Sequence, residues 1–168
     1  MQLTHYTSKF KPHTFPVTLI CDGINNAPNI GSLFRTADAF GVEKLIFCGN
    51  DMEIGRKSAK TSRATEKYVP FEINKDVLEV VSNLKSEGYK IIALEITETS
   101  KPINQIQFNT NQPIALVIGA ENFGVSEAVL DIAEAIIHLN MYGQNSSMNV
   151  VQATSICLYE ITQQLIEN

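Results

Sequence analysis

Short apolar runs alternate with amphipathic segments along almost the whole chain. Strands are predicted at 17–23, 44–49, 67–73, 89–96, 114–119 and 135–139, and helices at 28–40, 75–87, 126–133 and 147–166. This alternation favours a mainly parallel sheet, because two parallel strands need a crossover connection that is usually a helix. We therefore expect an α/β fold in which helices flank the sheet. The chain is expected to form a single domain over residues 1–168, without internal repeats or linkers.

The composition excludes several classes of protein. Hydrophobic residues make up 44% and charged residues 18% of the sequence, as is typical of a globular chain. No apolar run reaches the ~20 residues of a transmembrane helix, and the N-terminal stretch lacks the apolar core of a signal peptide, so we expect a cytoplasmic protein. Cys21, Cys48 and Cys157 form no CxxC pair or Cys/His cluster. This pattern predicts reduced, buried thiols and no metal site.

The charge is unevenly distributed. A net charge of −5 argues against tight non-specific binding of nucleic acid. However, residues 55–67 hold five of the thirteen Lys and Arg residues and only one acid, Glu66. The basic residues are Arg56, Lys57, Lys60, Arg63 and Lys67. Such a run is commonly a solvated loop, and alternatively it is a local patch that contacts phosphates.

The predicted helix 28–40 carries two residues that packing does not require. Its packing face consists of Ile30, Leu33, Phe34 and Ala37. Gly31 and Arg35 lie on the other side, and a glycine inside a helix costs ~1 kcal/mol relative to alanine. Arg35 leans back toward Gly31, so either it is an ordinary surface arginine or the missing side chain leaves room for a ligand beside the guanidinium. The helix start, with Asn25, Asn26 and Asn29, favours an anion such as phosphate.

Two further stretches place polar residues after predicted strands, where open α/β sheets bind ligands. LVIGAENFGVSE (116–127) has the GxxxxG spacing of a P-loop but lacks its GK[ST] continuation, so a nucleotide hydrolase is not supported. Its Glu121 either caps the following helix or serves a ligand. Downstream, Ser146 or Ser147 is expected to cap the last helix. Asn149 either assists that cap or hydrogen-bonds a ligand.

Three segments in this order resemble the signature motifs of the SpoU/TrmH family of RNA 2′-O-ribose methyltransferases, a branch of the SPOUT superfamily. They are NNAPNIGSLFRTADAFGV (25–42), LVIGAENFGVSE (116–127) and LNMYGQNSSMNVVQATSICLYE (139–160), within a motif-bearing core of about 17–162. The resemblance implies an α/β fold with a C-terminal trefoil knot, S-adenosyl-L-methionine as cofactor, and a homodimer. It also implies methyl transfer to a ribose 2′-hydroxyl of tRNA or rRNA. Many members carry an additional RNA-binding domain, and we expect none here, which favours tRNA.

The resemblance assigns roles to individual residues. The catalytic group is Arg35, Glu121 and Asn149. The cofactor group is Leu94, Glu95, Gly119, Leu139, Met141, Gly143, Ser147 and Met148. The RNA-contacting group is Asn25, Asn29, Arg56, Lys57, Lys60 and Arg63. Two competing interpretations are open: a non-catalytic RNA-binding protein that retains the knotted fold, and a small-molecule α/β enzyme in which the basic stretch has no role.

Overall fold

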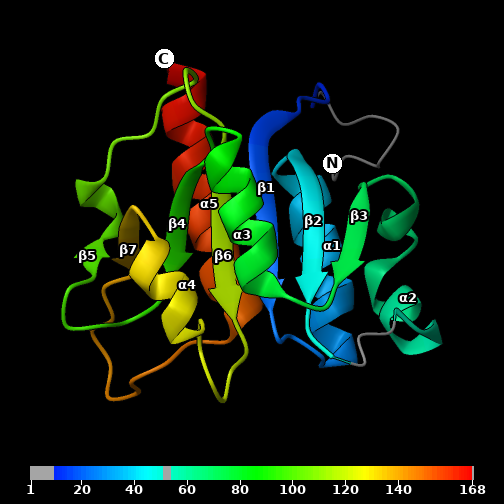
Figure 1. Cartoon of the computed structure of the whole chain (residues 1–168). Helices are drawn as coiled ribbons and strands as arrows, with labels where there is room; N and C mark the ends of the chain where they lie inside the picture. The colour runs from blue at the N-terminus through cyan, green and yellow to red at the C-terminus, as the bar shows by residue number, and fades with distance from the viewer. Residues whose placement is uncertain (1–9, 51–53, 168) are drawn as a thin grey trace.

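A parallel β-sheet with helices on both faces forms the centre of the molecule (Figure 1). The computed structural model describes residues 10–50 and 54–167, and within them the sheet has seven strands in the order β3-β2-β1-β6-β4-β7-β5. The strands are β1 (Phe15–Asp22), β2 (Val42–Cys48), β3 (Phe71–Asn74), β4 (Lys90–Leu94), β5 (Lys101–Pro102), β6 (Ile114–Gly119) and β7 (Ala135–His138). All neighbouring pairs are parallel. The predicted α/β fold with a mainly parallel sheet is confirmed.

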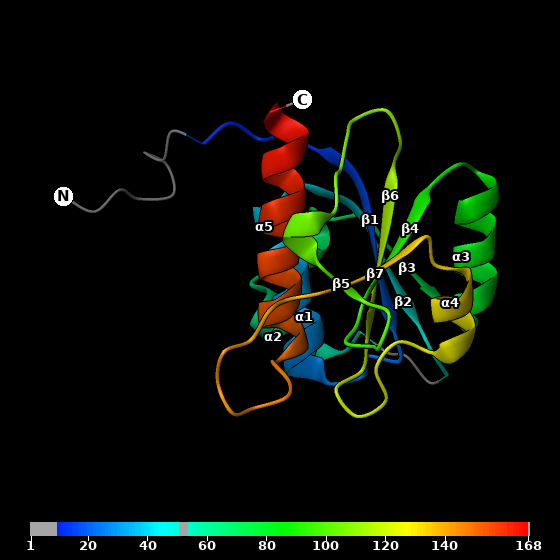
Figure 2. The ribbon, with the colours of Figure 1, turned by 90° about the vertical axis from the view of Figure 1, so that its left-hand side faces the viewer.

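The helices form two layers, one on each face of the sheet (Figure 2). One face carries α1 (Ala27–Ala39), α2 (Arg56–Ser62) and α5 (Val150–Glu167), and the other carries α3 (Val77–Ser86) and α4 (Glu127–Ile132). Two 3₁₀ turns, η1 (Thr65–Lys67) and η2 (Ile103–Gln105), lie in the connections. Within the described ranges, no helix has the length and apolar character needed to cross a membrane.

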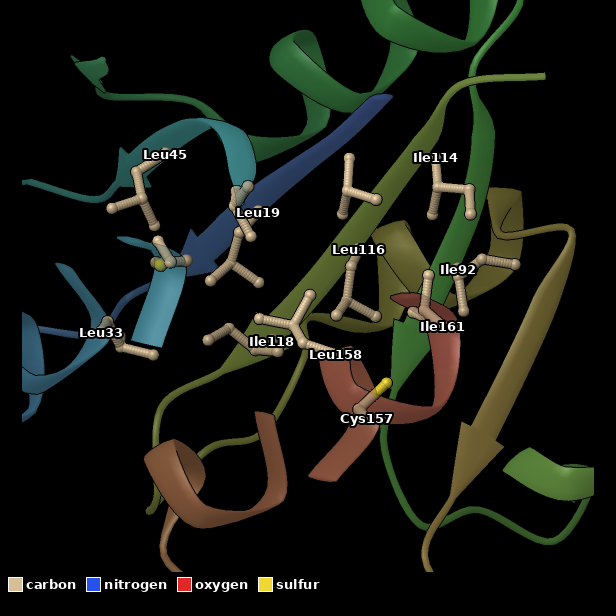
Figure 3. Close-up of a cluster of buried hydrophobic side chains, with 14 of the residues drawn as sticks. Leu19, Leu33, Leu45, Ile92, Ile114, Leu116, Ile118, Cys157, Leu158 and Ile161 are labelled. Atoms are coloured by element: carbon tan, nitrogen blue, oxygen red, sulfur yellow. The ribbon is translucent and has the colours of Figure 1, made fainter. Parts of the chain in front are cut away.

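The core fills the space between the sheet and both helical layers. Between the sheet and α1 and α5, the fully buried side chains include Leu19, Leu33, Leu45, Leu116, Leu158 and Ile161 (Figure 3). Alternate strand residues face the other layer, which explains why these strands read as continuous apolar runs. The three cysteines are free and buried, as predicted. Burial raises the pKa of the Cys21 and Cys157 thiols, and burial together with Asp22 raises the pKa of Cys48 to about 12.

Side chains just before two of the helices cap them. Asp76 caps α3, because its Oδ1 accepts hydrogen bonds from the N–H groups of Leu78 and Glu79 at 2.9 and 3.1 Å. The last helix begins at Val150, and Asn149 caps it by accepting from the N–H of Val151 at 3.0 Å. The predicted capping by Ser146 or Ser147 is therefore wrong, since the helix begins several residues later than expected.

The basic stretch is largely helical. It forms α2 and η1, joined by Arg63 and Ala64, which both adopt the left-handed conformation with φ of 53° and 69°. The following strand is shorter than predicted and begins at Phe71, directly after Pro70. This strand lies at an edge of the sheet, a position that tolerates Pro70 just before it, which has no N–H to donate to the ladder.

Gly31 is explained by helix packing. It is buried where α1 meets α2, and a Cβ atom built on it would lie 2.5 Å from the carbonyl oxygen of Ser58 and 2.6 Å from the Cβ of Thr61. The backbone of α2 thus occupies the space beside Gly31. The interpretation that this glycine leaves room for a ligand next to Arg35 is therefore wrong. It arose because sequence periodicity could not place a second helix at this position.

Candidate active site

A cavity of about 860 Å³ lies at the carboxyl ends of β4, β6 and β7. Its wall comes from residues in 94–97, 118–125, 138–141 and 147–153 and from Leu130 of α4, and the loops after β6 and β7 lie at the lower end of the sheet in Figure 1. Seven residues predicted to hold the cofactor line it, namely Leu94, Glu95, Gly119, Leu139, Met141, Ser147 and Met148. Gly143, the eighth, does not line it.

The loop after β6 is held in shape by Glu95. Gly124 adopts a φ of +66°, which glycine tolerates without a steric penalty, and its N–H donates to the carbonyl oxygen of Ala120 at 2.7 Å. One carboxylate oxygen of Glu95 accepts from the N–H of Val125 at 2.9 Å, and the other accepts from the N–H of Ile96 at 2.9 Å. Glu95 therefore fastens the end of β4 to the loop after β6.

Glu121, in the second motif, forms hydrogen bonds with one residue of each of the other two motifs. Its Oε1 accepts from the side-chain amide of Asn149 at 2.7 Å and from that of Asn29 at 3.2 Å, and the Asn149 amide also lies 3.3 Å from Asn29 Oδ1. Asn149 thus caps α5 with its oxygen and binds Glu121 with its nitrogen. The alternative that Glu121 caps α4 is wrong, because its hydrogen bonds go to the side chains of Asn29 and Asn149. The residue just before α4, Ser126, donates its N–H to Asp22 Oδ2 at 2.9 Å.

Arg35 lies apart from the large cavity. It is exposed on α1 and lines a smaller hollow of about 370 Å³ together with Thr36 and Ser155, whose hydroxyls are 3.2 Å apart. Along α5, Val150 and Ala153 line the large cavity, whereas Val151 and Ser155 line the smaller hollow. The structure of this chain therefore brings Glu121 and Asn149 together but leaves Arg35 on the other side of the first turns of α5.

The residues predicted to contact RNA occupy two places. Asn25 is exposed before α1, and Asn29 belongs to the Glu121 cluster. Lys60 and Arg63 are exposed at the end of α2. The backbone of Arg56 and Lys57 belongs to α2, while their side chains lie outside the described part of the chain.

The acid within the basic stretch has a defined partner. The Ser62 hydroxyl donates a hydrogen bond to Glu66, and this bond lowers the pKa of that carboxyl. Glu66 therefore keeps a negative charge next to the exposed cations.

His138 lines the large cavity and was missed by the sequence reasoning, as were Thr97 and Phe123. A usable signal was present, because His138 is the last residue of a strand and parallel strands end at a common edge. Phe123 is 90% exposed on the loop after β6, and neither helical nor strand periodicity marks such a loop residue.

Comparisons with known proteins show the family of this chain. Residues 16–159 match the model of the SpoU rRNA Methylase family. A tRNA (guanosine(18)-2′-O)-methyltransferase of Aquifex aeolicus is 29% identical over 146 residues, which cover 87% of this chain and 68% of that protein. A Staphylococcus saprophyticus protein named for the TrmH family of tRNA/rRNA methyltransferases is 30% identical over 144 residues, or 85% of this chain. This chain spans only 57% of the length of that relative.

Solved structures show the same fold. The crystal structure of the Aquifex aeolicus TrmH/SpoU tRNA modifying enzyme superposes with a TM-score of 0.83 at 28% identity, covering 92% of this chain and 78% of that one. The SpoU methyltransferase AviRb from Streptomyces viridochromogenes, in complex with AdoMet, gives a TM-score of 0.81 at 26% identity, covering 94% and 63%. Because the family model matches most of its length, and as its three motifs predicted, this chain belongs to the SpoU rRNA Methylase family.

Proposed function

We propose that this protein transfers a methyl group from S-adenosyl-L-methionine to a ribose 2′-hydroxyl of tRNA or rRNA. The observation that carries the proposal is the single cavity at the strand ends, which gathers seven of the eight residues predicted to hold the cofactor. The AdoMet complex of AviRb, which has the same fold, supports this cofactor. The name of the Aquifex relative supports tRNA as the substrate.

The cavity fits the proposed cofactor in size and chemistry. A volume of about 860 Å³ lies within the usual range of small-molecule sites. Leu94, Leu139 and Met148 offer apolar contacts for a flat base, and Ser147 and Thr97 offer hydroxyls for polar groups. S-adenosylmethionine supplies an already activated methyl group. The protein therefore has to hold the donor and position the hydroxyl in line with it.

In this proposal Arg35 orients a nucleotide phosphate and polarises the hydroxyl. A planar guanidinium that stays protonated suits both tasks, and deprotonation of the hydroxyl by Arg35 is not required. The cluster of Asn29, Glu121 and Asn149 fixes the relative positions of the three motifs beside the cavity. In this proposal, methyl transfer depends on the orientation of the ribose hydroxyl and on the positive charge of Arg35.

The proposal includes a homodimer. Arg35 and the large cavity lie on opposite sides of the first turns of α5, so a second copy is needed if a guanidinium is to face a bound methyl group. The outer face of α5 exposes Ile156 and Tyr159 by 47% and 56%, and such apolar groups suit a subunit interface. We also propose a C-terminal trefoil knot, recognition of RNA by residues of this domain, and a cytoplasmic location.

The test is a methyl-transfer assay with product identification. Purified protein is incubated with methyl-labelled S-adenosylmethionine and with tRNA or rRNA from cells that lack the gene, and the RNA is digested to nucleosides. We expect label in a 2′-O-methylnucleoside. Label in a methylated base would overturn the proposed transfer to a ribose 2′-hydroxyl. Binding of RNA without any transfer, in a protein that also fails to bind S-adenosylmethionine in calorimetry, would establish the non-catalytic alternative.

A further inference from the structure

His138 combines a place in the cavity wall with a fixed hydrogen-bond partner. It is the last residue of β7, is partly buried, and lines the large cavity. Its ring nitrogen Nδ1 lies 2.9 Å from the Oγ of Ser100. Ser100 belongs to the turn that follows β4 and is not part of the cavity wall.

The hydrogen bonds of Ser100 decide which ring nitrogen of His138 carries the proton. The Ser100 hydroxyl donates to the carbonyl oxygen of Thr97 at 2.8 Å and accepts from the N–H of Thr97 at 3.0 Å. A hydroxyl has one proton to donate, so Ser100 can only accept from His138. Nδ1 therefore carries the proton, and the neutral ring has its lone pair on Nε2.

This lone pair is available to a ligand. Among residues 10–50 and 54–167, no protein group hydrogen-bonds to Nε2 of His138. The neighbouring acidic group, Glu95, already accepts from two backbone N–H groups. Because Ser100 occupies the Nδ1 side of the ring, the side left for the cavity carries a hydrogen-bond acceptor.

We propose that Nε2 of His138 accepts a hydrogen bond from the adenosine part of the methyl donor, either from the exocyclic amine of adenine or from a ribose hydroxyl. This inference rests on the proposed cofactor site. Adenine presents an N–H donor where hypoxanthine presents an oxygen acceptor. If the amine is the partner, His138 selects an adenosine over an inosine donor, because two acceptors facing each other leave both without a hydrogen bond.

The first experiment uses calorimetry with S-adenosylhomocysteine, which binds without reacting. We expect His138→Phe to weaken binding about tenfold, and His138→Gln, which keeps an acceptor, to stay within about threefold of the parent. The matched control is His13→Phe, at the amino end of β1 and remote from the cavity, which should leave affinity unchanged. Parental affinity in His138→Phe would overturn the inference.

Ligand analogues identify the donor group. S-inosylhomocysteine tests the amine, and the 2′-deoxy and 3′-deoxy forms of S-adenosylhomocysteine test the two ribose hydroxyls. The partner of His138 is the group whose loss costs the parent about tenfold but costs His138→Phe little, because the interaction is already absent there. If every analogue loses the same factor in binding affinity in the parent and in His138→Phe, the inference is wrong.

The role of Ser100 has a spectroscopic readout. Nitrogen NMR of the neutral imidazole should show Nδ1 protonated in the parent, and Ser100→Ala should shift protonation toward Nε2 while weakening S-adenosylhomocysteine less than His138→Phe does. An Nε2-protonated ring in the parent would overturn the inference even if a variant misfolds. If the parent does not bind S-adenosylhomocysteine at all, the proposed function fails along with it. If the parent and His138→Phe bind S-adenosylhomocysteine equally well, only the inference about His138 fails, and the proposed function stands.

Discussion

The two hollows beside the first turns of α5 differ in how completely one chain builds them. The large cavity is walled by four segments, and Glu95 and the Asn29–Glu121–Asn149 cluster fasten these segments together. The smaller hollow is lined by α1, Phe40 and α5, and in the described part of the chain Arg35 makes no hydrogen bond or ion pair. The large cavity is therefore already shaped for a ligand, whereas the smaller hollow presents the charge of Arg35.

This difference indicates which ligand each hollow serves. A pre-shaped cavity binds a small molecule without first paying to order its own loops. An exposed guanidinium suits a large polyanion that brings its own charge and shape. Changes near Arg35 should therefore impair the RNA-dependent step and leave cofactor affinity intact, and the following predictions test that separation.

The largest effect is expected for Arg35→Ala. Removing a positioned charge from a transition state typically costs about 100- to 1000-fold in kcat. Affinity for S-adenosylhomocysteine should remain at the parental value, because Arg35 does not line the large cavity. Single-turnover methyl transfer and calorimetry on the same preparation measure both quantities. Parental kcat would remove Arg35 from the reaction, and lost cofactor affinity would contradict the separation of the two hollows.

Gly31→Ala should act on stability. Its new methyl group would meet the backbone of α2 at Ser58, and overpacking of this kind costs roughly 1–3 kcal/mol of unfolding free energy. Denaturant unfolding measures this loss. Gly55→Ala is a suitable control, because among the described residues, the two chain neighbours apart, no atom lies within 4 Å of a Cβ built there. Unchanged stability in Gly31→Ala would contradict the close packing of α2 against Gly31.

Gly31 also shows where sequence reasoning on the site succeeds and fails. The resemblance of the three motifs to a known family predicted seven cofactor residues of the cavity wall together with Glu121 and Asn149. The fold brings them together because parallel strands end at one edge of a sheet and the residues after them meet there. The motifs could not show that α2 packs against Gly31, since that contact depends on tertiary structure. They also could not separate Arg35 from Glu121, because a helical wheel gives a direction around α1 but no position relative to α5.

The fold shows a similar division. Strands buried on both faces, such as β1 and β6, were predicted to within two residues at each end from their apolar runs. The segment 55–67 has no apolar stripe, and its helix α2 escaped prediction because packing against Gly31 supports it. Asn149 was considered as a cap, yet its bond to Glu121 depends on a contact across 28 residues that local propensity cannot encode.

Glu121→Ala tests the link between the two regions. It removes the acceptor for two asparagine side chains, and we expect about 1 kcal/mol less stability and roughly tenfold slower methyl transfer. Glu121→Gln keeps an acceptor oxygen at the same position and is the matched control. Thermal unfolding and kcat should both rank the parent and Glu121→Gln above Glu121→Ala. If the two variants are equally impaired, the negative charge is essential and the hydrogen bonds are secondary.

The smallest effect is expected on α2, for the double change Lys60→Gln and Arg63→Gln. Both side chains are exposed, so each phosphate contact contributes modestly, and we expect about fivefold weaker RNA binding at low salt. The slope of log affinity against log salt should become shallower by about 1.4–1.8, the value for two lost phosphate contacts. The control pair Lys11→Gln and Lys85→Gln makes the same change in net charge away from α2. An equal loss in the control would mean that only net charge matters, and the basic stretch would then have no special part in binding RNA.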